Sequence, residues 1–172
     1  MGRKYFTIFI AVWTAVFMIA GSVPYLGFKL IAGLIIFLFI SGFAQRSPKK
    51  EALYLVAILY PPAELALKLS ATLIDPLAVN MAEHFIAGAL AALAASTVLD
   101  GTLEKLDRWE GLTFTVSSAV LFCLLYEIMG YAIYYEPSAI LYSDTMRDLS
   151  MNIAGAVMSA SIITVYGGRS GD

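Results

Sequence analysis

The chain has 172 residues, of which 60% are hydrophobic and 14% are charged, and its mean hydropathy is +0.80. Soluble globular domains carry about 25% charged residues, so this composition argues against a soluble fold and favours a membrane protein. The net charge of −2, without a basic patch, argues against a nucleic-acid partner. The single cysteine, Cys123, cannot form an intramolecular disulfide and has no partner for a cysteine-based metal site.

Six apolar segments follow one another along the chain, each near the roughly 20 residues that a membrane-spanning helix needs. They cover residues 5–22, 27–43, 53–73, 77–99, 112–135 and 144–166. The longest polar stretch between them, DGTLEKLDRWEG, covers residues 100–111. We therefore expect an all-α, polytopic bundle of about six transmembrane helices. It would form one integral membrane domain over residues 1–172, in a cell membrane and in contact with its lipids, and its oligomeric state is not specified by the sequence.

The positive charges predict how this bundle is oriented. With six helices, one side holds both termini and the loops after the second and fourth helices, and cytoplasmic loops are enriched in lysine and arginine. That side carries eight of the 11 basic residues, namely Arg3, Lys4, Arg46, Lys49, Lys50, Lys105, Arg108 and Arg169. Both termini are therefore predicted to be cytoplasmic, and the opposite, acid-rich end of the bundle is predicted to face outward.

Ionisable residues recur at similar depth near that outer end. By helix rise, His84 and Glu127 lie about 10–12 Å inside it. In the last segment Asp144, Asp148 and Asn152 fall four residues apart, which places them near one face of a helix. Because an ionisable group inside a membrane costs several kcal/mol unless it is paired or hydrated, such groups are functional candidates.

The residue types suit a metal. Carboxylates and an imidazole form a mixed nitrogen and oxygen ligand set that holds Zn²⁺, Mn²⁺, Fe²⁺ or Mg²⁺. We predict a divalent ion bound by His84, Glu127, Asp144 and Asp148, with Glu127 and His84 also the candidates for catalytic acid–base chemistry. Substrate-contacting or supporting roles are assigned to the remaining polar residues at this depth: Asn152, Arg147, Lys68 and Glu64.

Each residue also has a structural explanation. Asp144 can cap a helix N-terminus, Asn152 can join two helices by a hydrogen bond, and Glu64 and Lys68 can form an intrahelical ion pair. Three classes of function therefore stay open: an enzyme acting on a lipid or cell-envelope substrate, a cation-coupled transporter or channel, and a structural membrane subunit. The cytoplasmic half offers only small hydroxyl residues, which favours a one-sided pocket over a conduction path.

Three short motifs carry a resemblance to a known family. AEHFIAG at residues 82–88, LYEIMG at 125–130 and DTMRDLSMNIAGA at 144–156 resemble, in this order, the polar signature of the VanZ-like membrane proteins and their YjdF-type relatives. The match covers roughly the C-terminal ninety residues, and the residues that flank His84 and follow Glu127 are closer to the YjdF-type branch. The resemblance implies a polytopic cell-envelope protein, and no established biochemical activity comes with it.

Overall fold

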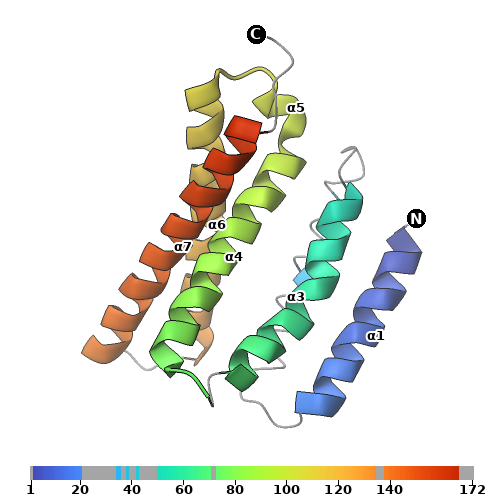
Figure 1. The fold of residues 1–172 in the computed structure, drawn as a ribbon, viewed down its shortest axis with the longest axis vertical. Helices are drawn as coiled ribbons and strands as arrows, with labels where there is room; N and C mark the ends of the chain where they lie inside the picture. Colours follow the sequence, from blue (N-terminus) through green and yellow to red (C-terminus); the bar gives the residue numbers. More distant parts are fainter. Residues whose placement is uncertain are drawn as a thin grey trace. The chain divides into compact units, whose positions relative to one another are not determined.

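The structure, a computed structural model, describes residues 2–20, 34, 35, 38, 42, 50–70, 73–134 and 138–166. Within these residues every regular element is a helix, which confirms the all-α prediction. The helices are α1 (Gly2–Ala20), α3 (Lys50–Ser70), α4 (Pro76–Val98), α5 (Asp100–Leu103), α6 (Arg108–Tyr134) and α7 (Ala139–Tyr166) (Figure 1). The predicted second segment, residues 27–43, falls almost wholly outside the described residues.

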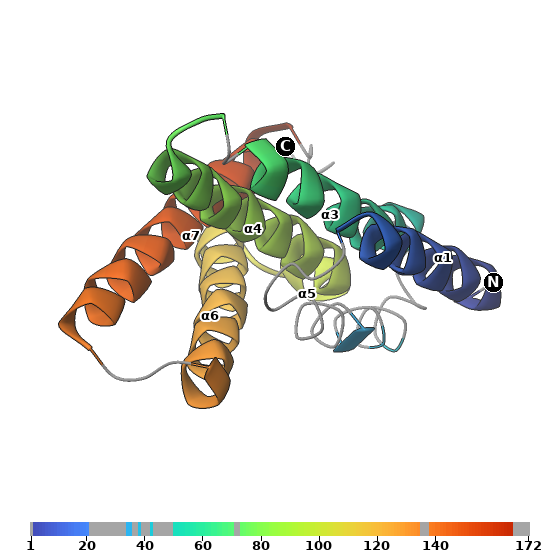
Figure 2. The same cartoon turned by 90° about the horizontal axis from the view of Figure 1, so that it is seen from below.

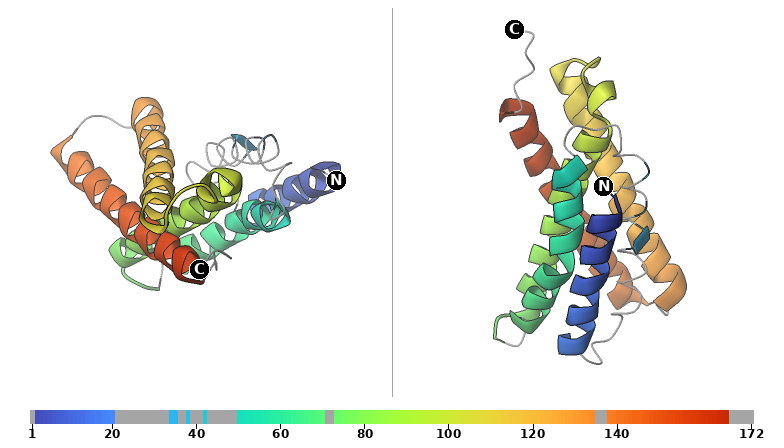
Figure 3. Two further views of the ribbon diagram at one scale, coloured as in Figure 1. Left: turned by 90° about the horizontal axis from the view of Figure 1, so that it is seen from above. Right: turned by 90° about the vertical axis from the view of Figure 1, so that its right-hand side faces the viewer.

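The chain divides into two compact units, Met1–Ile74 and Asp75–Asp172. In the first unit α1 runs beside α3 (Figure 3), and the rings of Tyr5 and Tyr54 stack with centroids 4.7 Å apart. Phe9, Trp13 and Leu53 form the best-buried part of this contact. The organisation as a single integral membrane domain stays a prediction.

Three described helices are long and apolar enough to cross a membrane, over Pro76–Val98, Arg108–Ala132 and Ile140–Tyr166. All three belong to the second unit, and the shorter apolar stretch Lys4–Val16 lies in α1. Large apolar side chains on these helices remain exposed, as expected for contact with lipid. The chain thus has the character of a membrane protein, whereas the number of spans and the side of each terminus stay predictions.

Small residues bring α4, α6 and α7 together in the second unit. Its core is a cluster of four fully buried alanines: Ala92, Ala119, Ala156 and Ala160. Transmembrane helices favour such residues at their contacts because they allow close approach of the backbones. Gly88 and Gly155 mark the tightest approach, since a Cβ on Gly88 would overlap the carbonyl of Asn152, and one on Gly155 would overlap the carbonyl of Phe85.

The last helix begins earlier than the sequence predicted. The Oγ of Ser138 accepts a hydrogen bond from the backbone N–H of Leu141 at 3.1 Å, and α7 starts at Ala139 rather than at residue 144. Asp144 therefore lies in the second turn, and the interpretation that it caps the helix is wrong. Figure 2 shows that α6 and α7 diverge toward the C-terminal end of α6 and the N-terminal end of α7.

Candidate metal-binding site

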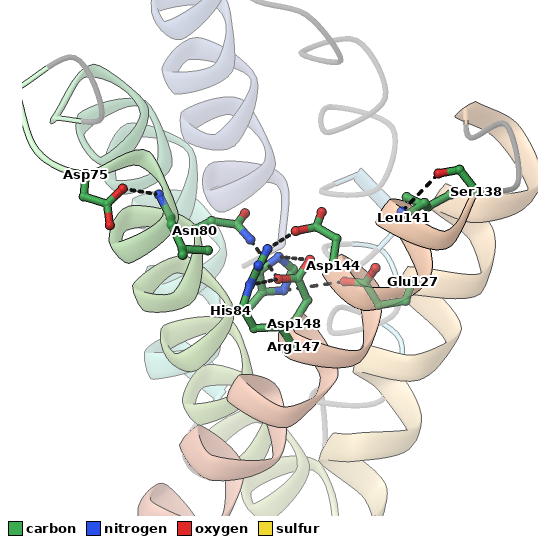
Figure 4. Close-up of polar contacts among 10 residues, drawn as sticks. Asp75, Asn80, His84, Glu127, Ser138, Leu141, Asp144, Arg147 and Asp148 are labelled. Atoms are coloured by element: carbon green, nitrogen blue, oxygen red, sulfur yellow. Dashed lines mark hydrogen bonds and ion pairs between the residues drawn. The ribbon is translucent and has the colours of Figure 1, made fainter.

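Five of the predicted polar residues, His84, Glu127, Asp144, Arg147 and Asp148, gather in the three-helix unit (Figure 4). His84 lies in the third turn of α4 and Asp148 in the third turn of α7, while Glu127 comes seven residues before the end of α6. Because α4 and α7 enter one end of this unit and α6 leaves it, all three side chains lie about 10–14 Å from the helix ends. Their common depth agrees with the sequence prediction.

His84, Glu127 and Asp148 form one compact group, which we call the His–Glu–Asp cluster. The Nδ1 atom of His84 lies 3.5 Å from a carboxylate oxygen of Glu127, and its Nε2 atom lies 3.3 Å from Oδ2 of Asp148. One ligand atom from each residue falls within 4.8 Å of the others. The side chains are only 16%, 10% and 9% exposed, respectively, so the cluster is largely shielded from solvent.

The cluster needs a shared positive charge or proton. A neutral imidazole has one N–H, so it can donate to only one of the two carboxylates that face its nitrogens. The second contact becomes favourable if the ring or a carboxyl carries another proton, or if a cation lies between the groups. Two buried carboxylates beside one imidazole therefore form either an ion-paired triad or a cation-binding set.

Two asparagines support the cluster, and the sequence analysis found only one of them. Asn80 donates from Nδ2 to Oδ1 of Asp148 at 2.7 Å, and Nδ2 of Asn152 lies 3.4 Å from Nδ1 of His84. Both contacts join residues 68 positions apart, which shows that α4 and α7 run parallel in a fixed register. Asn80 comes four residues before His84, and this shared helix face was the signal that could have identified it.

Asp144 and Arg147 lie beside the cluster rather than within it. The guanidinium of Arg147 donates to Oδ1 of Asp144, an ion pair between residues three apart on α7. The Nε atom of Arg147 lies 4.0 Å from Oδ1 of Asp148, which links this pair to the cluster. Asp144, predicted as a fourth ligand, is thus not among the three residues that the structure brings together.

The remaining predicted residues, Glu64 and Lys68, lie on α3 in the first unit. Their side chains fall outside the described part of the chain, so their predicted supporting role stays a prediction.

The donors fit a divalent metal ion. One imidazole nitrogen and two carboxylate oxygens are the ligands that Zn²⁺, Mn²⁺ and Fe²⁺ take from proteins, and the two negative charges would balance the ion. Asn152 lies next to this ligand set, since its Nδ2 atom is 3.4 Å from His84. Its Oδ1 atom is buried and has no hydrogen-bond partner among the described residues. A protonated His84 between the two carboxylates would account for the same distances, and metal analysis distinguishes the two arrangements.

Comparisons of the chain with known protein families, with curated proteins and with solved structures found no match.

Proposed function

We propose that this chain is a polytopic membrane protein that binds a divalent metal ion at the His–Glu–Asp cluster and acts on a lipid or cell-envelope substrate from the outer side of the membrane. The observation that carries the proposal is the convergence of His84, Glu127 and Asp148 from three membrane-length helices. Ionisable groups at such depth are costly unless they bind a ligand or one another.

In this proposal each residue has a separate task. His84, Glu127 and Asp148 supply one ligand atom each, and Asn80 holds Asp148 through its other oxygen. Second-sphere hydrogen bonds of this kind fix the orientation of a ligand and raise the affinity for the metal. A bound divalent ion would supply Lewis-acid polarisation of a substrate oxygen or a more acidic bound water.

The packing of the helices supports a pocket rather than a conduction path. On the far side of the cluster, the described parts of α4, α6 and α7 close over the alanine core. The buried hydroxyls of Ser96 and Thr97 both donate to the carbonyl of Leu93 on their own helix. These two hydroxyls are thus satisfied within their own helix, which favours the pocket.

The resemblance to the VanZ-like and YjdF-type proteins agrees with this proposal. The motifs that carry the resemblance contain all three cluster residues, as well as Arg147 and Asn152. We therefore propose membership of that superfamily and a cell-envelope location, on the basis of these motifs.

Metal analysis of the purified protein tests the proposal. We expect about one divalent ion per chain after exposure to Zn²⁺, Mn²⁺, Fe²⁺ or Mg²⁺, because the described residues offer one set of three ligands and solvent can fill the remaining positions. Glu127→Gln keeps the shape of the side chain but removes a charged ligand, so it should lower metal content while the protein still inserts and remains monodisperse. Glu104→Gln, at an exposed glutamate next to α5, is the matched control. A wild-type protein that stays metal-free after this exposure, or a Glu127→Gln protein with full metal content, would refute the metal-binding role.

A further inference from the structure

Arg147 borders a shallow hollow at the edge of the His–Glu–Asp cluster. The hollow is lined by Ile140, Ser143, Asp144 and Arg147, all on the first turns of α7. Figure 4 shows Arg147 and Asp144 next to Asp148, whose other contacts lead to His84 and Asn80. A ligand in the hollow would therefore lie beside the cluster.

The guanidinium of Arg147 has donors to spare. An arginine carries five N–H donors, and a terminal nitrogen of Arg147 donates to Asp144. Its Nε is buried and has no hydrogen-bond partner among the described residues, since Oδ1 of Asp148 lies at 4.0 Å. The side chain is 32% exposed, so the guanidinium can still be reached from outside.

The guanidinium of Arg147 becomes available to an anionic ligand when its pair with Asp144 opens. With a divalent ion bound, the charges of Glu127 and Asp148 would be balanced, and the Arg147–Asp144 pair would be neutral by itself. The side chain of Asp144 is 47% exposed, and an ion pair this exposed contributes little to stability, so Asp144 can turn outward and release the guanidinium. A phosphate would replace it by a bidentate, charge-assisted pair, which arginine forms with particular strength.

The same hollow has an apolar wall. Ile140, which lines the hollow, is 84% exposed. A ligand with a phosphate at Arg147 and a hydrocarbon portion along this surface would match both features. We infer that Arg147 binds the phosphate of an amphiphilic substrate and places the group next to that phosphate at the His–Glu–Asp cluster. This inference rests on the proposed function and narrows its substrate to phosphate-bearing lipids.

Binding measurements on the intact, Zn²⁺-loaded protein in detergent test the inference. The probes are dioleoyl phosphatidate, dioleoylglycerol as its phosphate-free counterpart, and inorganic phosphate. We expect phosphatidate to bind and dioleoylglycerol to bind at least tenfold more weakly. Arg147→Gln should weaken phosphatidate binding at least tenfold, and Arg147→Lys should lie between, because lysine keeps the charge but loses the planar fork. Arg108→Gln, at an exposed arginine at the start of α6, is the matched control.

The metal content of each variant separates failure of the inference from failure of the proposed function. If Arg147→Gln and Arg147→Lys both keep their Zn²⁺ and bind phosphatidate as tightly as the wild type, the inference is wrong while the metal site stands. A wild-type protein without Zn²⁺ overturns both. Competition by inorganic phosphate would show that the phosphate alone is recognised, whereas binding of phosphatidate without such competition would show that the lipid portion is also required.

Discussion

At the scale of single residues, Asp148 connects all the parts of the site. Its Oδ2 faces His84, while its Oδ1 accepts from Asn80 and lies toward Arg147. Because each oxygen has a different partner, the plane of the Asp148 carboxylate is fixed, and Oδ2 stays directed at His84. The neutral amide of Asn80 thereby contributes to the site without adding charge.

The role of Asn80 leads to a prediction about metal affinity. Asn80→Ala removes a 2.7 Å hydrogen bond to Asp148 and lets the carboxylate rotate, so the affinity for the metal should fall about 10–100-fold, as for other second-sphere partners. Competition with a fluorescent chelator measures this change. Thr113→Ala, at an exposed position near the other end of α6, should leave the affinity unchanged. An Asn80→Ala protein with wild-type affinity would show that the hydrogen bond does not orient a ligand.

Helix geometry explains which site residues could be predicted from sequence. Four residues turn a helix by about 400°, so each step in an i, i+4 series drifts by about 40°. Asp148 and Asn152 both remain directed at α4, where they contact Asn80 and His84. Asp144, four residues before Asp148, is rotated by about 40° from it around α7. It pairs with Arg147 on its own helix instead. Spacing thus predicted the face correctly over two positions but not over three.

At the scale of helices, the site depends on how closely α4 and α7 approach. Gly88 lies one turn after His84, at the point where the carbonyl of Asn152 occupies the space of a side chain. Gly155 makes the reciprocal contact with Phe85. With any larger residue at either position the helices would have to separate, and His84 would move away from Asp148.

Gly88→Ala should therefore destabilise the protein and reduce metal binding together. In an isolated helix the same change would stabilise by about 1 kcal/mol, because alanine is the better helix former. Here the backbone conflict should outweigh this gain, since overpacking typically costs about 1–3 kcal/mol. Unfolding in a denaturing detergent and metal titration measure the two effects. Gly101→Ala is the matched control, because a Cβ there meets nothing within 4 Å. A Gly88→Ala protein more stable than the wild type would contradict the tight approach.

The helix boundaries show where local sequence is insufficient. Ser138 and Ser143 are both good capping residues, and the chain between them, AILY, suits a helix as well as a loop. The structure uses Ser138, which adds more than a turn before Asp144. The register of α4 against α7, which pairs Asn80 with Asp148, likewise depends on the glycine contacts between distant segments. Hydropathy predicts apolar helices well because the membrane requires them, but it does not specify which faces meet.

At the scale of the whole molecule, the three membrane-length helices have chemically different ends. Lys105 lies in the connection between α4 and α6, and Arg108 begins α6, while the cluster lies toward the opposite end of these helices, where Ser138 precedes α7. The C-terminal end of α7 lies on the side of Lys105, because α7 runs parallel to α4. Basic residues favour the cytoplasmic side, so the outward-facing site stays a prediction that follows from these charges.

Cysteine labelling tests this orientation. In a chain with Cys123→Ala, which removes the free and buried native thiol, single cysteines are placed at two exposed positions, Ser138→Cys and Thr102→Cys. We expect a membrane-impermeant maleimide to label Ser138→Cys in intact cells, and to label Thr102→Cys only after the cells are permeabilised, because α4 and α6 would separate the two positions by a full membrane span. The reverse pattern would place the His–Glu–Asp cluster on the cytoplasmic side. The substrate would then have to reach the cluster from the inner leaflet, and the basic loop would be an exception to the charge rule.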